Sequence, residues 1–293
     1  MSKCTFCPLP WNSINLRNNG DMRICCNTNS YSPQRGIMKK EDGTPYNAGK
    51  DDWNEARNAE LLKEVRVSMM KGEWHPECTR CKKEEESGIR SRREYENDDW
   101  GKWFGDMNLE KVLPITEEDG TIDTSKQDIE FMDIRYGNFC NLKCRMCQSQ
   151  NSSAIHKDLL QEYTEEEKQF VVDQTHWGHF PEQSYEWFDT PEFLENVETW
   201  LPNVNRLYFT GGEPTIIQRV YWILQKCVDM GIAKDIDLVF NSNMTNIQPR
   251  FLDMLSNFRE VLMCLSVDGY AETNTYIRGG STWSVIDKHI RDY

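Results

Sequence analysis

The chain has 293 residues, 38% of them hydrophobic, and a formal net charge of -14. This length allows one large core with an appended module. The negative charge opposes contact with a phosphate backbone, so nucleic acid is not an expected partner. No run of about 18 apolar residues marks a membrane span, and the first residues lack the pattern of a signal peptide. We therefore expect a soluble, cytoplasmic protein.

Cysteine is the most informative residue type, because the chain contains 11 of them. Cytosolic redox buffers disfavour disulfides, so we expect reduced thiols that act as ligands or nucleophiles.

Residues 1–97 form a cysteine-rich block. Helical spacing of apolar residues predicts a helix over 53–73, and a second helix over 80–97 is interrupted by Gly88. The cysteines of the block are Cys4, Cys7, Cys25, Cys26, Cys78 and Cys81.

Residues 98–127 mix glycine, proline, aspartate and aromatic residues without a sustained period. Such a stretch is typical of a linker, so we place a domain boundary there.

Residues 128–293 alternate short apolar runs with helical stretches. This alternation indicates an α/β fold with parallel strands, as in a barrel or a doubly wound sheet. The strands are expected at 129–136, 206–211, 236–243 and 261–269, and the helices that follow the last three at 218–231, 248–258 and 281–293. About 70 residues join the first two strands, which is far beyond a normal crossover. We therefore predict a helical insertion at about 150–203.

Three cysteines with C-x3-C-x2-C spacing follow the first predicted strand: Cys140, Cys144 and Cys147. A structural zinc site needs four protein ligands, so three thiolates on one loop leave a metal position open for a substrate or cofactor. Crowded soft thiolates also suit a cubane iron-sulfur cluster.

This loop resembles the hallmark of the radical S-adenosylmethionine (SAM) enzymes. In that family three cysteines hold a 4Fe-4S cluster, and the fourth iron binds the amino and carboxylate groups of SAM. The resemblance implies a TIM-like (β/α) barrel, here a partial one with about four of the usual six units. Met146 stands where the family often has an aromatic residue near the adenine, and methionine can fill that space.

Other segments at predicted strand ends strengthen the resemblance. Gly211, Gly212, Glu213 and Pro214 resemble the segment that receives the amino group of SAM. Ser242 and Asn243 resemble a polar turn at the same rim, and Ser266 and Arg278 resemble the residues that contact ribose and carboxylate. All of these segments follow strands, where barrel enzymes build their active sites.

The N-terminal cysteines suggest a second metal site, formed by Cys7, Cys25, Cys78 and Cys81. Their spacing alone permits a Cys4 zinc site. The pattern also resembles the SPASM and twitch modules of radical SAM enzymes, in which such cysteines hold an auxiliary 4Fe-4S cluster, although those modules normally follow the barrel. Cys26 is the alternate to Cys25. The arrangement is similar to that of phage and bacterial twitch-domain radical enzymes.

The resemblance implies an enzyme that cleaves SAM reductively to a 5'-deoxyadenosyl radical, which abstracts hydrogen from a substrate. A peptide or protein side chain is the expected substrate, and a sugar or nucleotide-like small molecule that is dehydrogenated is the alternative. The competing class is a non-catalytic iron-sulfur electron carrier or a zinc-binding interaction protein. A flavodoxin- or ferredoxin-like reductant is an implied partner, as is a second chain that completes the barrel. No acid or base residue is assigned.

Overall fold

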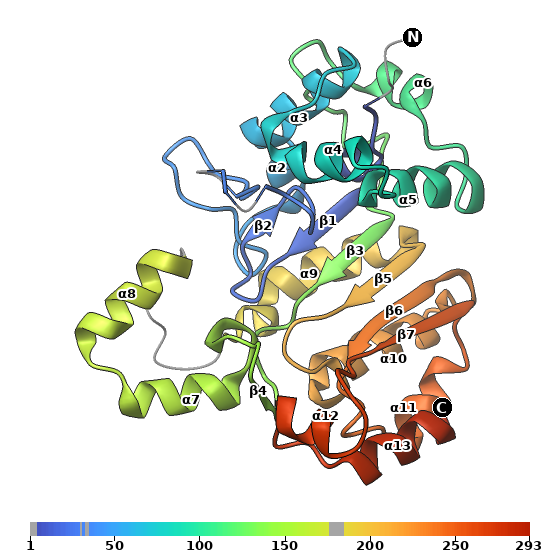
Figure 1. The fold of residues 1–293 in the computed structure, drawn as a ribbon. Coiled ribbons are helices and arrows are strands. Elements are labelled where there is room, and N and C mark those ends of the chain that lie inside the picture. Colours follow the sequence, from blue (N-terminus) through green and yellow to red (C-terminus); the bar gives the residue numbers. More distant parts are fainter. Residues whose placement is uncertain (1–4, 30, 33–34, 176–184) are drawn as a thin grey trace. The chain divides into compact units, whose positions relative to one another are not determined.

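The computed structural model describes residues 5–29, 31–32, 35–175 and 185–293 (Figure 1). The chain forms two compact units, and each is built from several segments. Unit 1 comprises Met1–Leu16, Asp21–Asp133 and Pro191–Asn205, and unit 2 comprises Arg17–Gly20, Ile134–Thr190 and Arg206–Tyr293. These boundaries differ from the expected division at 98–127, because unit 1 continues through that segment to the first predicted strand of the barrel.

The strands of unit 1 explain why it extends so far along the chain. β1 (Ser13–Leu16) pairs antiparallel with the short β2 (Met22–Arg23). β1 also pairs in parallel with β3 (Phe131–Ile134), where Ser13 lies opposite Phe131. The cysteine-rich block therefore adds strands beside the first expected barrel strand.

The helices of unit 1 are short. They are α1 (Leu9–Asn12), α2 (Trp53–Arg57), α3 (Glu60–Met70), α4 (Thr79–Glu86), α5 (Arg92–Asp98), α6 (Leu109–Val112) and α9 (Pro191–Trp200). The single helix expected over 53–73 is divided between α2 and α3. Asn58 ends α2, and its side chain bonds both the N–H (2.9 Å) and the carbonyl (3.0 Å) of Ile122. These tertiary bonds favour a break over a continuous helix.

Residues 98–127 belong to unit 1 and contact its other segments. Trp100 is only 1% exposed and lies in a π-helical turn, Asp99–Trp103. The buried Arg66 guanidinium donates to the carbonyls of Gly120 and Pro10, each at 3.0 Å. These hydrogen bonds join three segments that are far apart in the sequence. Local sequence patterns cannot predict such contacts.

Unit 2 contains the other three expected strands, in the order β5 (Arg206–Phe209), β6 (Asp237–Ser242) and β7 (Glu260–Leu265), all parallel. α10 (Gln218–Asp229) and α11 (Pro249–Leu255) lie behind these strands in Figure 1. Phe240 of β6 packs on Phe251 of α11, with ring centroids 5.4 Å apart. α12 (Glu272–Ile277) and α13 (Trp283–Asp292) follow β7. The alternating pattern predicted from the sequence is thus confirmed.

The expected helical insertion is divided between the two units. α7 (Ser153–Glu162), α8 (Glu165–Thr175) and a 3-10 turn at Trp187–Asp189 belong to unit 2, whereas α9 belongs to unit 1. In α9, Phe193 packs on Trp53 with ring centroids 5.9 Å apart, which accounts for that assignment. None of the helices in the described part of the chain has the length and apolar character needed to cross a membrane.

β7 is an edge strand among the strands that the structure describes, since it pairs with β6 alone. Its Leu262 side chain is 59% exposed. An apolar edge can accept a further strand, so the completion of the barrel by a second chain stays a prediction.

Candidate cofactor and metal sites

The loop that carries Cys140, Cys144 and Cys147 is held by the first turn of α7. The Cys140 N–H donates to Ser153 Oγ (3.1 Å), and the Ser152 hydroxyl donates to the Leu142 carbonyl (2.7 Å). Leu142 itself is buried. Leu142, between the first two cysteines, therefore anchors the loop. The three thiols remain at the surface of a cavity.

A two-stranded ribbon brings Arg278 to the cysteine loop. β4 (Lys143–Cys144) pairs antiparallel with β8 (Arg278–Gly279), and Cys144 lies opposite Arg278. Arg278 Nη1 lies 3.8 Å from Cys144 Sγ, and its Nε lies 2.7 Å from Asp268 Oδ2. Arg278, which the sequence predicted as a site residue, thus lies beside the Cys144 thiol although the two are far apart in the chain.

One cavity of about 330 Å³ in unit 2 collects most of the predicted residues. Those that line it are Cys140, Cys144, Met146, Cys147, Gly211, Gly212, Glu213, Asn243, Ser266 and Arg278. They come from the loops that follow β3, β5, β6 and β7, together with β8. The common edge of parallel strands explains why segments up to 138 positions apart in the numbering, from Cys140 to Arg278, meet at one place.

Two predicted residues do not line this cavity. Ser242 is fully buried behind the wall, and its hydroxyl donates to Glu213 Oε1 at 2.9 Å. Pro214 is also buried and begins the 3-10 turn Pro214–Ile216. The structure places both of them where they shape the wall of the cavity.

The cavity also contains four residues that the sequence analysis missed: Arg135, Asn151, Thr210 and Asn241. Three of them lie at strand ends. Arg135 directly follows β3, Thr210 directly follows β5, and Asn241 is the penultimate residue of β6. A polar side chain at the end of an apolar strand was the signal that could have identified them.

The Glu213 carboxylate joins the loops after β5 and β6. Its Oε1 accepts hydrogen bonds from Thr215 N, Thr215 Oγ1 and Ser242 Oγ, and its Oε2 accepts one from Asn243 N at 2.7 Å. Burial raises the pKa of Glu213, and these hydrogen bonds oppose that shift. Since a carboxylate oxygen can accept two bonds, Oε2 keeps acceptor capacity for an ammonium group.

The three thiols are suited to a thiolate-held cluster with one open metal position. Burial raises the pKa of Cys140 to about 11 and raises those of Cys144 and Cys147, while Arg278 lowers that of Cys144. A bound metal must therefore displace protons from these thiols. Across the described ranges, no three His, Cys, Asp or Glu side chains converge to hold a metal ion as they stand, so the thiols must reorient when a cluster binds.

We expect one methyl group added at Gly212 to destabilise the folded protein strongly. Its φ is +53°, and a Cβ there would lie 2.4 Å from the Phe139 carbonyl oxygen. We expect Gly212→Ala to lower the free energy of unfolding by about 3 kcal/mol, through the left-handed backbone and the clash together. Urea denaturation measures this change.

Gly231→Ala is the matched control, because Gly231 has a φ of +71° and open space around its Cβ position. This variant should lose only about 1 kcal/mol. Equal losses in the two variants would show that the close approach to Phe139 has no energetic importance.

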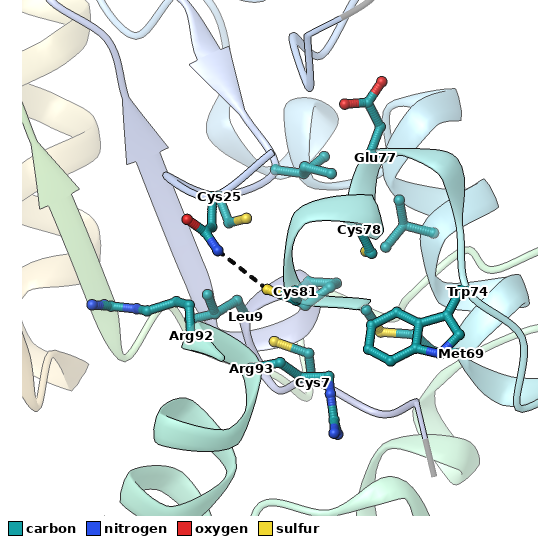
Figure 2. A pocket seen from close by; sticks show the side chains of 14 residues that line it. Cys7, Leu9, Cys25, Met69, Trp74, Glu77, Cys78, Cys81, Arg92 and Arg93 are labelled. Carbon is teal, nitrogen blue, oxygen red and sulfur yellow. Dashed lines mark hydrogen bonds between the residues drawn. The ribbon is translucent and has the colours of Figure 1, made fainter. Parts of the chain in front are cut away.

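A second group of cysteines surrounds a cavity in unit 1. Figure 2 shows the side chains of Cys7, Cys25, Cys78 and Cys81 directed into this cavity, from the segment before α1, the segment after β2 and the start of α4. The cavity has a volume of about 30 Å³, which is room for one or two water molecules. A cubane cluster is larger than this space, so the four thiols must move apart to admit one.

Polar groups lie next to this second cavity. The Asn27 amide donates to Cys81 Sγ at 3.3 Å, the dashed line in Figure 2. Arg93 also lines the cavity and binds both carboxylate oxygens of Glu85 at 2.8 Å. Burial raises the pKa of Cys78 to about 12. The surroundings thus supply one donor to a cysteine sulfur and one nearby cation.

Cys26 does not line the cavity that Cys25 lines. It borders only a different, narrow space together with Asn15 and Asp133, and Cys25 borders both spaces. The structure therefore groups Cys25, and not its neighbour, with Cys7, Cys78 and Cys81. Cys4 lies outside the described residues.

Unit 2 thus presents three thiols and a polar cavity at the carboxyl ends of parallel strands, which is the arrangement of an enzyme that binds a cluster and a cofactor together. The family model described as Radical SAM superfamily matches residues 134–293. The chain belongs to this superfamily, and its membership implies an enzyme with a 4Fe-4S cluster, SAM and radical chemistry. Comparisons with curated proteins and with solved structures find no match.

Proposed function

We propose that the cavity in unit 2 is the SAM site, with the 4Fe-4S cluster held by Cys140, Cys144 and Cys147. One observation carries this proposal. Residues from four segments outside the cysteine loop, each selected for its resemblance to a cofactor contact, line the same cavity as the three thiols.

When bound, the cluster supplies one electron that cleaves SAM to methionine and a 5'-deoxyadenosyl radical. The residues of the chain bind and orient the cofactor. Arg278 can hold the carboxylate with its planar fork, and Oε2 of Glu213 can accept a bond from the amino group. Ser266 and Met146 also line the cavity, and in this proposal they contact the ribose and cover the adenine.

The substrate that we propose is a peptide or protein side chain. This choice rests on the resemblance of the N-terminal cysteines to SPASM and twitch modules, which occur in peptide-modifying enzymes. Dehydrogenation of a small molecule is the second candidate. In both cases a flavodoxin- or ferredoxin-like donor in the cytoplasm would reduce the cluster, and the ten described cysteines, all free, suit a reducing compartment.

We further propose an auxiliary 4Fe-4S cluster at Cys7, Cys25, Cys78 and Cys81. Four thiolates suffice to ligate such a cluster fully, and the four thiols share one cavity.

Anaerobic reconstitution tests the proposed activity. The full chain, loaded with iron and sulfide and reduced with dithionite, should convert SAM to 5'-deoxyadenosine and methionine, which chromatography quantifies. The same protein without added iron is the control. A reduced, cluster-loaded chain that leaves SAM intact would identify an electron carrier or a scaffold instead.

A further inference from the structure

Arg135 is a cation in the wall of the proposed SAM cavity, and the sequence analysis gave it no role. We infer that Arg135 binds a negatively charged group of the substrate, a carboxylate or a phosphate. This inference rests on the proposed function, because it places the substrate in the cavity where the cofactor would be cleaved.

The Arg135 side chain has no partner among the residues that the structure describes. No hydrogen bond, ion pair or ring contact joins its guanidinium to any of the residues that the structure describes, and its Nε is a buried donor without an acceptor. Removing such a donor from water without a compensating bond is unfavourable. A ligand that supplies the missing acceptors would remove this cost.

The absence of a side chain at Gly211 leaves room for Arg135. A Cβ at Gly211 would lie 2.8 Å from Arg135 Cβ and 2.9 Å from the Asn18 amide nitrogen. Asn18 is itself fixed, since its amide donates to the Gly137 carbonyl at 2.7 Å. The stem of Arg135 therefore lies in a fitted position against the loop after β5, and its direction is set by the fold.

Arg135 also has polar neighbours in the cavity wall. Thr210 N–H donates to the Ile134 carbonyl at 3.2 Å, which places Thr210 beside Arg135. Asn241 Nδ2 lies 3.3 Å from Thr210 Oγ1, so the polar row continues to the end of β6. Charged and hydroxyl groups in one row suit a ligand with several oxygen acceptors.

Arg278 fits the cofactor carboxylate better than Arg135 does. Arg278 lies beside Cys144, one of the three thiols that would hold the cluster. Arg135 instead belongs to the row formed with Thr210 and Asn241 at the ends of β3, β5 and β6. The two arginines therefore serve two different anions, one on the cofactor and one on the substrate.

The net negative charge of the chain bears on which ligand the Arg135 guanidinium binds. At a net charge of -14, the protein repels anionic molecules in general. A planar guanidinium inside a cavity overcomes that repulsion locally, because it can form two parallel bonds to a carboxylate or a phosphate. We therefore expect an acidic substrate.

The test uses the full chain with its cluster reconstituted and SAM bound. Inorganic phosphate and glutarate, a dicarboxylate, are titrated separately by calorimetry, and the two arms distinguish the two sources of negative charge. We expect the wild type to bind at least one of them and R135Q to bind it at least 10-fold more weakly. R135K should recover part of the affinity. R250Q, which changes an exposed arginine on α11, should bind as the wild type does.

Three results would overturn the inference: binding of neither anion by the wild type, equal binding by R135Q, or a 10-fold loss of SAM affinity in R135Q. The last result would assign Arg135 to the cofactor. Formation of 5'-deoxyadenosine is measured on the same samples and reports on the proposed function separately. Loss of anion binding in R135Q without any SAM cleavage in the wild type would reject the proposed function and leave an anion site at Arg135.

Discussion

Replacing Cys140 by alanine should abolish the cleavage of SAM. The chain offers three thiols to the cluster of unit 2, and all of them line one cavity with the proposed cofactor contacts. With two thiols left, the cluster loses a ligand and the site no longer holds SAM at a defined iron. We expect the rate of 5'-deoxyadenosine formation to fall by on the order of 1,000-fold or more, a barrier increase of about 4 kcal/mol.

Cys264→Ala is the matched control for this variant. Cys264 is an exposed residue of β7, and it is not among the residues that line the cavity. Its removal should leave both the iron content and the rate unchanged. A Cys140→Ala protein that cleaves SAM at the wild-type rate would exclude the cluster site at residues 140–147.

The fold of unit 2 was predictable because β5, β6 and β7 each contain an apolar run, and β5 and β6 are each followed by a helix with buried apolar residues. In α10 the buried residues Val220, Ile223, Leu224 and Cys227 follow the 3.6-residue period. The shared cavity of the proposed cofactor residues was predictable for a related reason. Parallel strands end at one edge, so motifs at strand ends meet there without further information.

The pairing of β1 with β3 could not be predicted in the same way. β1 has four residues, and Ser13 and Phe131 are far apart in the sequence. Local periodicity does not encode which distant strand becomes a neighbour. The same limit applies to residues 98–127, where the buried Arg66 fixes a segment that resembles a linker in composition.

The role of Glu213 also needed the structure. The sequence resemblance implied a contact with the cofactor, and the carboxylate does line the cavity. However, four hydrogen bonds from Thr215, Ser242 and Asn243 already bind it. Glu213 therefore holds the loops after β5 and β6 together, in addition to its proposed contact with SAM. The sequence motif identifies Glu213, whereas the hydrogen bonds in the structure show how many bonds its two carboxylate oxygens already accept.

Replacing Cys25 by alanine should remove the auxiliary cluster and leave the SAM cluster in place. The reconstituted wild type is expected to hold about eight irons per chain, and Cys25→Ala about four. The reason is geometric, since Cys25 shares a cavity with Cys7, Cys78 and Cys81 in unit 1, whereas the other three thiols belong to unit 2. Iron and sulfide analysis measures the change, and cleavage of SAM should persist.

Cys26→Ala makes this comparison strict, because the adjacent cysteine borders a different space. Cys26→Ala should keep about eight irons per chain. A lower iron content in Cys25→Ala alone would then reflect the loss of a cluster ligand and not general damage to the segment after β2. Loss of iron in Cys26→Ala alone would make Cys26 the ligand. A wild type with about four irons and one zinc would contradict the auxiliary cluster itself, and the small cavity of unit 1 would then be a closed structural zinc site.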